Sequence, residues 1–250
     1  MDFTVLTLFP EFVEGFFRHG VIGRAVESGV ISGRALNIRD FSTDRHHTVD
    51  DRPYGGGCGM VMKPEPLDAA IAQARKNIPG AGVLMMTPRG NRFDQRKAEA
   101  LAAERKNLIL ICGRYEGVDE RVCRRHVDEE ISVGDFVMTG GEIAAMAVID
   151  AAARLIPGVL GREESARSDS FADGRLEHHH YTRPEVFEGE AVPGVLLSGN
   201  HELISRWRMK DSLIRTYMRR PDLFDKKKPT EREKQVLKEI CRELESIAGK

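Results

Sequence analysis

The sequence lacks the paired cysteines of a disulfide-stabilised or zinc-binding protein. Its four cysteines, Cys58, Cys112, Cys123 and Cys241, are scattered along 250 residues, and no two of them form a CxxC pair. This spacing argues against a disulfide framework and against a cysteine-rich zinc site. Because free cysteines suit a reducing compartment, we expect a cytoplasmic protein.

Long apolar runs are also missing. No stretch approaches the roughly 18 to 20 uninterrupted apolar residues that a membrane-spanning helix requires. Met1 leads directly into a strand-like run, without the features of a secretory signal. We therefore expect a soluble, unprocessed protein that has no membrane partner.

The chain also lacks a large net charge, because its 38 Lys and Arg are balanced by 39 Asp and Glu. The chain therefore does not have the overall positive charge that is typical of many nucleic-acid-binding proteins. A binding face, however, needs only local positive charge. Residues 201–228 have that local charge, with nine Lys or Arg against four acids. The excess suits contact with phosphates, although a solvated helix face has a similar composition.

The apolar residues that are present form short runs without alternation, which predicts strands buried on both faces of a sheet. These runs span residues 3–8, 83–86 and 108–112. Helical patterns lie at 64–75, at 94–103 and at 141–156. Asp94 is a suitable N-cap for the second helix, and Pro157 ends the third. The pattern predicts an α/β fold, and ordinary rules of chain topology predict an unknotted doubly wound sheet.

A change of composition divides the chain. Residues 161–174 are rich in Gly, Arg, Glu, Ser and Asp, which is typical of an exposed, mobile linker. After it, helices are expected at 201–220 and 231–247, separated by two prolines. The predicted organisation is a first domain at 1–160, a flexible linker at 161–175 and a small helical domain at 176–250.

The helix expected at 201–220 has two distinct faces at about 100° per residue. One stripe is apolar and consists of Leu203, Trp207, Ile214 and Met218. The opposite side is basic and consists of Arg208, Arg215 and Arg219. The basic side is the part of this helix that suits phosphate contact.

Residues 44–60 combine dense charge with a glycine cluster, in the order DRHHTVDDRPYGGGCGM. Four glycines within five positions give backbone freedom at a high entropic cost. The segment is therefore either a flexible linker or a loop whose backbone approaches a ligand closely. It has neither the GxxxxGK[ST] of a P-loop nor the GxGxxG of a dinucleotide-binding turn, so the usual nucleotide cradles are disfavoured.

Three further loops follow strand-like runs, which is where ligands usually bind in α/β sheets. They lie within residues 87–90, 112–121 and 131–142. Taken singly, each is also compatible with a plain tight turn. Together they favour three loops that converge on one ligand, with free main-chain amides at the start of the helix at 141–156 to hold a carboxylate.

Several long motifs, taken in order, carry a family resemblance. They are DRPYGGGCGM, ILICGRYEGVDERV, ISVGDFVMTGGE, RLIPGVLG, DSFADG and HYTRPEVFEGEAVPGVLLSGNHELI. Together they resemble the bacterial tRNA (guanine-N1)-methyltransferases that modify guanosine-37, beside the anticodon. The match runs from Leu8 to Pro221, nearly the full chain, which makes it highly specific.

The resemblance implies an N-terminal α/β domain with a trefoil knot, as in the SPOUT superfamily, and an obligate homodimer with each active site between subunits. It also implies that main-chain groups of the knot loops hold S-adenosylmethionine. By position, the donor site consists of Met86, Thr87, Pro88, Gly113, Tyr115, Glu116, Ser132, Val133, Gly134, Phe136, Met138, Gly140 and Gly141. Phe136 and Thr139 replace a common tyrosine and serine, Cys58 replaces an expected proline, and His178 and His179 replace a less histidine-rich pair.

The resemblance further implies how the reaction proceeds. Guanine N1 carries a proton and is a poor nucleophile until that proton leaves, so a general base is required. Asp169 matches the family's proposed base, and Arg154 matches the residue that stabilises charge on guanine O6. A magnesium ion is expected to assist, although no protein metal ligand is assigned. The expected partner is tRNA, and its expected contacts are Arg208, Arg215 and Arg219.

The residues alone leave rival interpretations open. A noncatalytic RNA-binding protein explains the basic helix but not the glycine-bearing loops. A nucleotidase with metal-binding carboxylates such as Asp50 and Asp51 lacks a phosphate cradle. A zinc site at His178, His179 and His180 is disfavoured because adjacent histidines seldom converge on one ion. A related knotted methyltransferase with another RNA target is the nearest alternative among enzymes.

Overall fold

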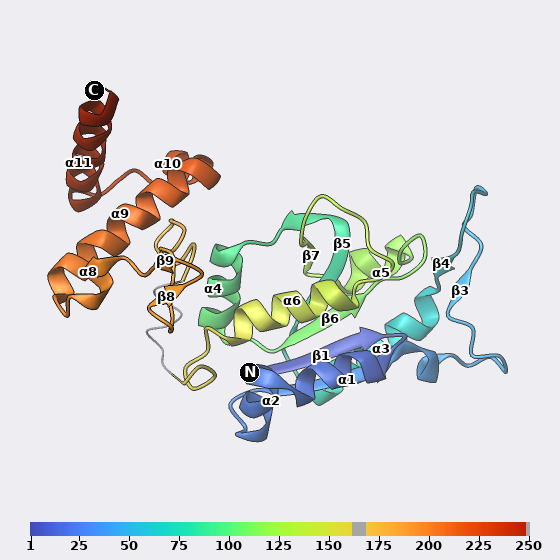
Figure 1. Cartoon of the computed structure of the whole chain (residues 1–250). Coiled ribbons are helices and arrows are strands. Elements are labelled where there is room, and N and C mark those ends of the chain that lie inside the picture. The colour runs from blue at the N-terminus through green and yellow to red at the C-terminus, as the bar shows by residue number, and fades with distance from the viewer. Residues whose placement is uncertain (162–168, 249–250) are drawn as a thin grey trace. The chain divides into compact units, whose positions relative to one another are not determined.

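The computed structural model describes residues 1–161 and 169–248. Contacts within the chain divide it into two compact units, Met1–Glu163 and Glu164–Lys250. Figure 1 shows the helices and strands of each unit. About half of the linker predicted at 161–175 lies outside the described residues, because these omit 162–168.

A five-stranded parallel sheet forms the centre of the first unit, in the order β2-β1-β6-β5-β7. Its strands are β1 (Asp2–Thr7), β2 (Ser32–Asn37), β5 (Gly82–Arg92), β6 (Leu108–Cys112) and β7 (Glu129–Ser132). Three of them occupy the apolar runs at 3–8, 83–86 and 108–112. The predicted α/β fold with a parallel sheet is therefore confirmed.

Helices cover both faces of this sheet (Figure 1). One face packs against α1 (Pro10–Arg18), α2 (Gly20–Glu27), α4 (Gln95–Glu104) and α6 (Glu142–Ala153). The other packs against α3 (Pro64–Asn77), α5 (Glu120–His126) and the 3-10 helix η1 (Ile38–Phe41). The short strands β3 (Asp50–Asp51) and β4 (Val61–Met62) pair antiparallel as a separate ribbon.

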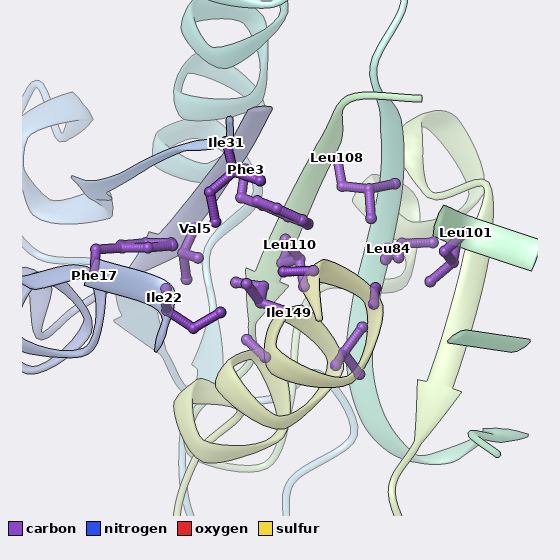
Figure 2. Close-up of a cluster of buried hydrophobic side chains, with 14 of the residues drawn as sticks. Phe3, Val5, Phe17, Ile22, Ile31, Leu84, Leu101, Leu108, Leu110 and Ile149 are labelled. Carbon is purple, nitrogen blue, oxygen red and sulfur yellow. The ribbon is translucent and has the colours of Figure 1, made fainter. Parts of the chain in front are cut away.

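The central strand β6 is buried along its whole length. Successive side chains of a strand point to opposite faces, so Leu108 and Leu110 join one hydrophobic cluster while Ile109 and Ile111 join the other. Figure 2 shows the first cluster, in which Ile149 of α6 lies near Leu110. Burial on both faces explains why the apolar runs show no alternation.

The three helices predicted in this unit are confirmed to within a few residues. The helix α4 begins after Asp94, whose Oδ1 accepts a hydrogen bond from Lys97 N at 3.0 Å, as expected of an N-cap. The helix α6 ends at Ala153, three residues before the predicted end. The reason is that Leu155 N and Ile156 N already bond to carbonyls three residues back, which tightens the chain into turns before Pro157.

The second unit contains two short strands and four helices among its described residues. They are β8 (Val186–Phe187), β9 (Glu190–Ala191), α8 (Gly194–Leu197), α9 (His201–Arg219), α10 (Asp222–Lys226) and α11 (Glu231–Ala248). The helix α9 is capped by Asn200, whose side chain accepts from Glu202 N and Leu203 N. Helices α9 and α11 occupy the two ranges in which helices were expected, and they are joined by ion pairs such as that between Lys210 and Glu243.

The apolar stripe of α9 is only partly covered within this unit, where Trp207 is half-buried. Leu203, Ile214 and Met218 are 49%, 41% and 72% exposed, whereas Leu213 and Thr216 are buried. At about 100° per residue, the buried pair therefore lies outside both the apolar stripe and the basic side of the helix. In the described part of the chain, no helix is both long and apolar enough to cross a bilayer.

Candidate functional site

A cavity of about 250 Å³ opens where the loops after β6 and β7 meet the chain beyond Met86 of β5. All thirteen residues that the resemblance assigns to donor binding line it. Residues that the sequence reasoning did not assign also line it, among them Arg114, Val137 and Ala144. The structure therefore brings the glycine-bearing loops together around one space, at the edge of the sheet where ligands usually bind.

Main-chain hydrogen bonds join these loops to one another. Gly141 N donates to Gly113 O at 3.0 Å, which ties the start of α6 to the end of β6. Glu116 N donates to Met60 O at 2.9 Å, and Met62 N donates to Gly117 O at 2.9 Å. Because the backbone itself fixes the loops, the cavity has a defined shape that does not depend on flexible side chains.

Glycine is required where the loops touch most closely. A Cβ added at Gly141 would lie 2.8 Å from Cys112 Cα, a contact with backbone that cannot move aside easily. The loop after β6 also includes Tyr115, which adopts a left-handed conformation with φ of 60°. The backbone of this segment is therefore bent toward the cavity at some conformational cost.

A buried carboxylate lies beneath the cavity. Glu142 is 1% exposed and accepts a hydrogen bond from Thr7 Oγ1 at 2.8 Å. Arg114 Nη2 lies 3.0 Å from Glu142 Oε2, and Arg114 Nη1 donates to Thr139 O at 3.2 Å. The guanidinium also lies over the Phe9 ring, 4.4 Å from its centroid. This network links the ends of β1 and β6 to the loop before α6.

Burial also makes the Cys112 thiol unreactive. The thiol is buried, and this desolvation, together with the nearby charge of Glu142, raises the pKa of Cys112 well above its usual range. A thiol is nucleophilic only as the thiolate, so Cys112 behaves as a core residue. All four cysteines are free in the structure.

Residues 87–90, which were predicted as a loop after the strand, lie within β5 at the point where its pairing with β7 shifts register, and Arg89 holds them in place. It forms ion pairs of 3.0 Å with Glu120 and 2.9 Å with Glu130. Hydrogen bonds from Arg124 and Arg89 lower the pKa of the Glu120 carboxyl. Arg89 therefore secures the irregular part of β5 that presents Thr87 and Pro88 to the cavity.

The predicted catalytic residues lie on different units. Arg154 is the C-cap of α6 in the first unit, where its N donates to Asp150 O at 3.1 Å. Asp169 is the first residue described after the gap and belongs to the second unit, where its O accepts from Ala172 N at 3.2 Å. Both side chains are half-buried.

The predicted RNA contacts have different surroundings within α9. Arg208 and Arg219 are exposed. Arg215 is half-buried and donates through Nη1 to Glu177 O at 3.3 Å, so part of its hydrogen-bonding capacity is used within the protein. Arg208 also lines a second cavity, formed within the second unit.

The glycine cluster at 55–59 lies at the end of the ribbon formed by β3 and β4. Gly55, Gly56, Gly57 and Gly59 all have positive φ, which explains the choice of glycine. Tyr54 is fully exposed, and the cluster returns toward the cavity at Gly59, where an added Cβ would meet the Glu116 side chain. Among the described residues, no three His, Cys, Asp or Glu side chains converge as metal ligands, either here or at the histidine run.

Comparison with known proteins adds to this geometry. A profile of the family described as "tRNA (Guanine-1)-methyltransferase TrmD" matches residues 1–226. A tRNA (guanine-N(1)-)-methyltransferase of Proteus mirabilis (strain HI4320) is 54% identical over 240 residues, which are 96% of each chain. The enzyme of that name from Marinomonas sp. (strain MWYL1) is 51% identical over 245 residues, or 98% of each chain. This chain therefore belongs to the tRNA (guanine-1)-methyltransferase family.

Proposed function

We propose that this protein transfers the methyl group of S-adenosylmethionine to N1 of guanosine-37 in tRNA. The observation that carries the proposal is the convergence of all thirteen expected donor residues around one cavity. The name shared by the full-length relatives, tRNA (guanine-N(1)-)-methyltransferase, supports the reaction and the RNA. Position 37 and the identity of the donor follow from the motif resemblance.

The cavity suits a donor that is read by main-chain groups. Its walls combine apolar surface, such as Met138 and Ala144, with the backbone of loops at 113–117 and 132–141. Apolar walls with a few fixed polar groups are typical of cofactor sites. The first-turn amides of α6 are suited to hold a carboxylate, as those of helix N-termini generally are.

The reaction divides between the two predicted catalytic residues. Asp169 accepts the proton of guanine N1, and the N1 electron pair then forms a bond to the sulfonium methyl carbon while the carbon–sulfur bond breaks. The positive charge of Arg154 stabilises the negative charge that develops on guanine O6. The products are the methylated guanine, the neutral thioether and a protonated carboxyl.

A magnesium ion, when bound, supplies positive charge that stabilises a developing anion. Magnesium usually keeps several waters and needs only one or two protein carboxylates, so the lack of a three-ligand cluster among the described residues is compatible with it. Glu116 is the carboxylate on the cavity wall and is the residue proposed to hold it.

Three further features belong to the proposal. Support for the trefoil knot comes from the loops after β6 and β7, which are joined by the bridge between Arg114 and Gly140. The homodimer, with its site shared between subunits, accounts for catalytic residues carried on two units. The cytoplasm is the proposed location because tRNA is the substrate.

One assay tests the function directly. The purified protein is incubated with labelled S-adenosylmethionine and with tRNA transcripts that differ only at the nucleotide after the anticodon. We expect label on N1 of guanosine at that position and none when another base replaces it. Label on a different nucleotide would indicate a related RNA methyltransferase, and absence of label from every transcript would refute the proposal.

Arg154→Ala is expected to lower turnover much more than donor affinity. The loss should be about a hundredfold or more in kcat, because a positioned charge acts on the transition state rather than on the bound donor. Calorimetry with the donor and single-turnover methylation measure the two quantities. Arg24→Ala in α2 is the matched control, and an equal loss of affinity and rate in Arg154→Ala would contradict the assigned role.

Gly141→Ala is expected to weaken donor binding about tenfold or more. The added methyl would lie 2.8 Å from Cys112 Cα and 3.0 Å from Met86 Cβ, so this part of the cavity wall must shift, and such overpacking costs about 1–3 kcal/mol. Donor titration by calorimetry measures the effect. Gly15→Ala in α1 is the control, since nothing lies within 4 Å of its added Cβ, and equal donor affinity in the two variants would show that this contact does not shape the site.

A further inference from the structure

The second cavity lies within the second unit, and its lining includes Arg208 and the histidine run at 178–180 but no residue of the donor cavity. It has a volume of about 660 Å³ and is formed by residues 178–185, by α8 with the chain before it, and by the beginning of α9. This volume is within the usual range for a small-molecule or nucleotide site. Neither the donor cavity nor the proposed proton transfer uses it.

The lining includes the rings of His178, His180 and Tyr181, and Trp207 contacts this ring group. The rings of His178 and His180 lie 4.5 Å apart between centroids. Trp207 meets His178 edge-on at 6.4 Å and Tyr181 at 6.2 Å. Tyr181 is 50% exposed, so one ring of the group remains open to a flat ligand.

Apolar side chains also line the cavity. Val192, Leu196 and Ile204 line the cavity and are half-buried. A cavity lined by both rings and aliphatic side chains favours a flat ring system over a bare ion.

Positive charge lies at the rim. Arg183 and Arg208 line the cavity, are exposed, and form no ion pair with the residues that the structure describes. Two nearby acids already have partners, because Asp211 pairs with His179 at 2.8 Å and Glu177 pairs with His180 at 3.2 Å. Glu185 is the one carboxylate in the lining, so the two guanidinium groups leave an excess of positive charge.

The neutral state of the His178 imidazole is consistent with stacking of its ring on a base. Burial, with the neighbouring His180 and Arg208, lowers the pKa of His178, and the carboxylates of Asp211 and Glu177 only partly oppose this. The imidazole is therefore neutral near pH 7 and presents an uncharged ring.

We infer that this cavity binds one unpaired nucleotide of the RNA substrate, away from the nucleotide that is methylated. Its base would lie against the ring group and its phosphate beside Arg183 and Arg208. Unpaired bases are the parts of an RNA that stack on aromatic side chains, and arginine is the usual phosphate contact. The inference rests on the proposed function only in taking RNA as the substrate.

The single tryptophan of the chain provides a specific test, because Trp207 contacts the ring group. Tryptophan emission of the full-length protein is followed during titration with a short single-stranded RNA and, separately, with inorganic tripolyphosphate. A base in the cavity is expected to change the emission in a saturable way, whereas tripolyphosphate should not. Equal changes with both probes would show a site for phosphate alone and would overturn the inference.

Variants distinguish binding of RNA in this cavity from nonspecific electrostatic attraction of RNA to the protein. Tyr181→Ala and the cavity-filling Val192→Phe are each expected to weaken the RNA-dependent change about tenfold, since stacking of one base contributes strongly to affinity. The exposed arginine of α11 gives the control Arg242→Gln, which should leave it unchanged. Unaltered titrations in both cavity variants would overturn the inference, and the thermal unfolding of each variant shows whether it is folded.

Methylation assays on the same variants keep the two proposals distinguishable. If the cavity variants bind and methylate tRNA like the unchanged protein, the cavity has no RNA role while the methyltransferase function stands. If they bind tRNA about tenfold more weakly with unchanged donor affinity, the nucleotide site is supported. If the unchanged protein methylates no tRNA yet its tryptophan responds to RNA but not to tripolyphosphate, the function fails and the cavity remains an RNA site.

Discussion

Asp169→Asn is expected to abolish measurable turnover and to leave donor binding intact. Asparagine has nearly the shape of aspartate but cannot accept the proton of guanine N1, so the nucleophile is not formed. Removal of a general base usually costs about a hundredfold to ten-thousandfold in rate. Single-turnover methylation of tRNA measures the loss, and calorimetry with S-adenosylmethionine measures the binding.

Asp225→Asn is the matched control for this experiment, because it makes the same chemical change at an exposed carboxylate of the second unit. It should keep normal turnover. Near-normal turnover in Asp169→Asn would assign the base to another group. A loss of donor affinity equal to the loss of rate would give Asp169 a binding role instead.

The sequence predicted the central strands because their environment makes a strong local pattern. The three strands β1, β5 and β6 lie in the interior of the sheet and carry the uninterrupted apolar runs. The edge strand β2 (Ser32–Asn37) was not predicted, since it is only partly buried and its sequence, SGRALN, is largely polar. Helices α1 and α2 were also missed.

The donor cavity was predictable to a different degree. Glycine-bearing loops after buried strands indicated a ligand site, and the family motifs supplied the positions that the structure brings together. The pair formed by Arg114 and Glu142 was not predictable, because the two residues are 28 positions apart and neither has an unusual local pattern. Contacts of this kind depend on how the loops fold back on the sheet.

Periodicity alone did not identify the residues of α9 that are most deeply buried. Leu203, Ile214 and Met218 of the regular stripe are exposed, while Leu213 and Thr216 are buried. Thr216 is buried because its hydroxyl has partners, accepting from Leu176 N at 3.0 Å and donating to Ser212 O at 2.7 Å. A polar side chain satisfied by its neighbours can therefore occupy a face that the hydrophobic pattern does not indicate.

Arg175→Ala is expected to destabilise the second unit by about 3–5 kcal/mol. Arg175 is 2% exposed, and its Nε lies 3.0 Å from Glu233 Oε1. It also donates to the carbonyls of Leu223 at 3.0 Å and Lys227 at 2.9 Å, and it lies over the Phe224 ring at 4.3 Å. Its removal leaves a buried carboxylate and two carbonyls without these donors.

Denaturant unfolding followed by Trp207 emission measures this loss, because the only tryptophan lies in the second unit. Arg232→Ala, at an exposed position of α11, is the control and should change the midpoint little. Equal midpoints for Arg175→Ala and the unchanged protein would show that the buried pair contributes nothing.

The loss should also depend on pH. Burial raises the pKa of Glu233, but hydrogen bonds from Thr230 and the charge of Arg175 outweigh it, so the pKa lies below its ordinary value of 4.5. A carboxyl with a lowered pKa stabilises the folded state above its unfolded pKa, and this contribution is lost as the pH falls through the folded pKa. The difference between Arg175→Ala and the unchanged protein should therefore shrink below about pH 4.5.

The same arginine links stability to the proposed chemistry. Its carbonyl accepts from Phe171 N at 2.7 Å, so the turn that follows Asp169 is held to Arg175 and, through its side chain, to α10 and α11. Arg175→Lys keeps the charge but cannot reproduce the planar set of donors. It should therefore lower turnover about tenfold under conditions where the second unit is still folded, because catalysis is sensitive to small displacements of a base. Unchanged turnover in folded Arg175→Lys would show that the position of Asp169 does not depend on this anchor.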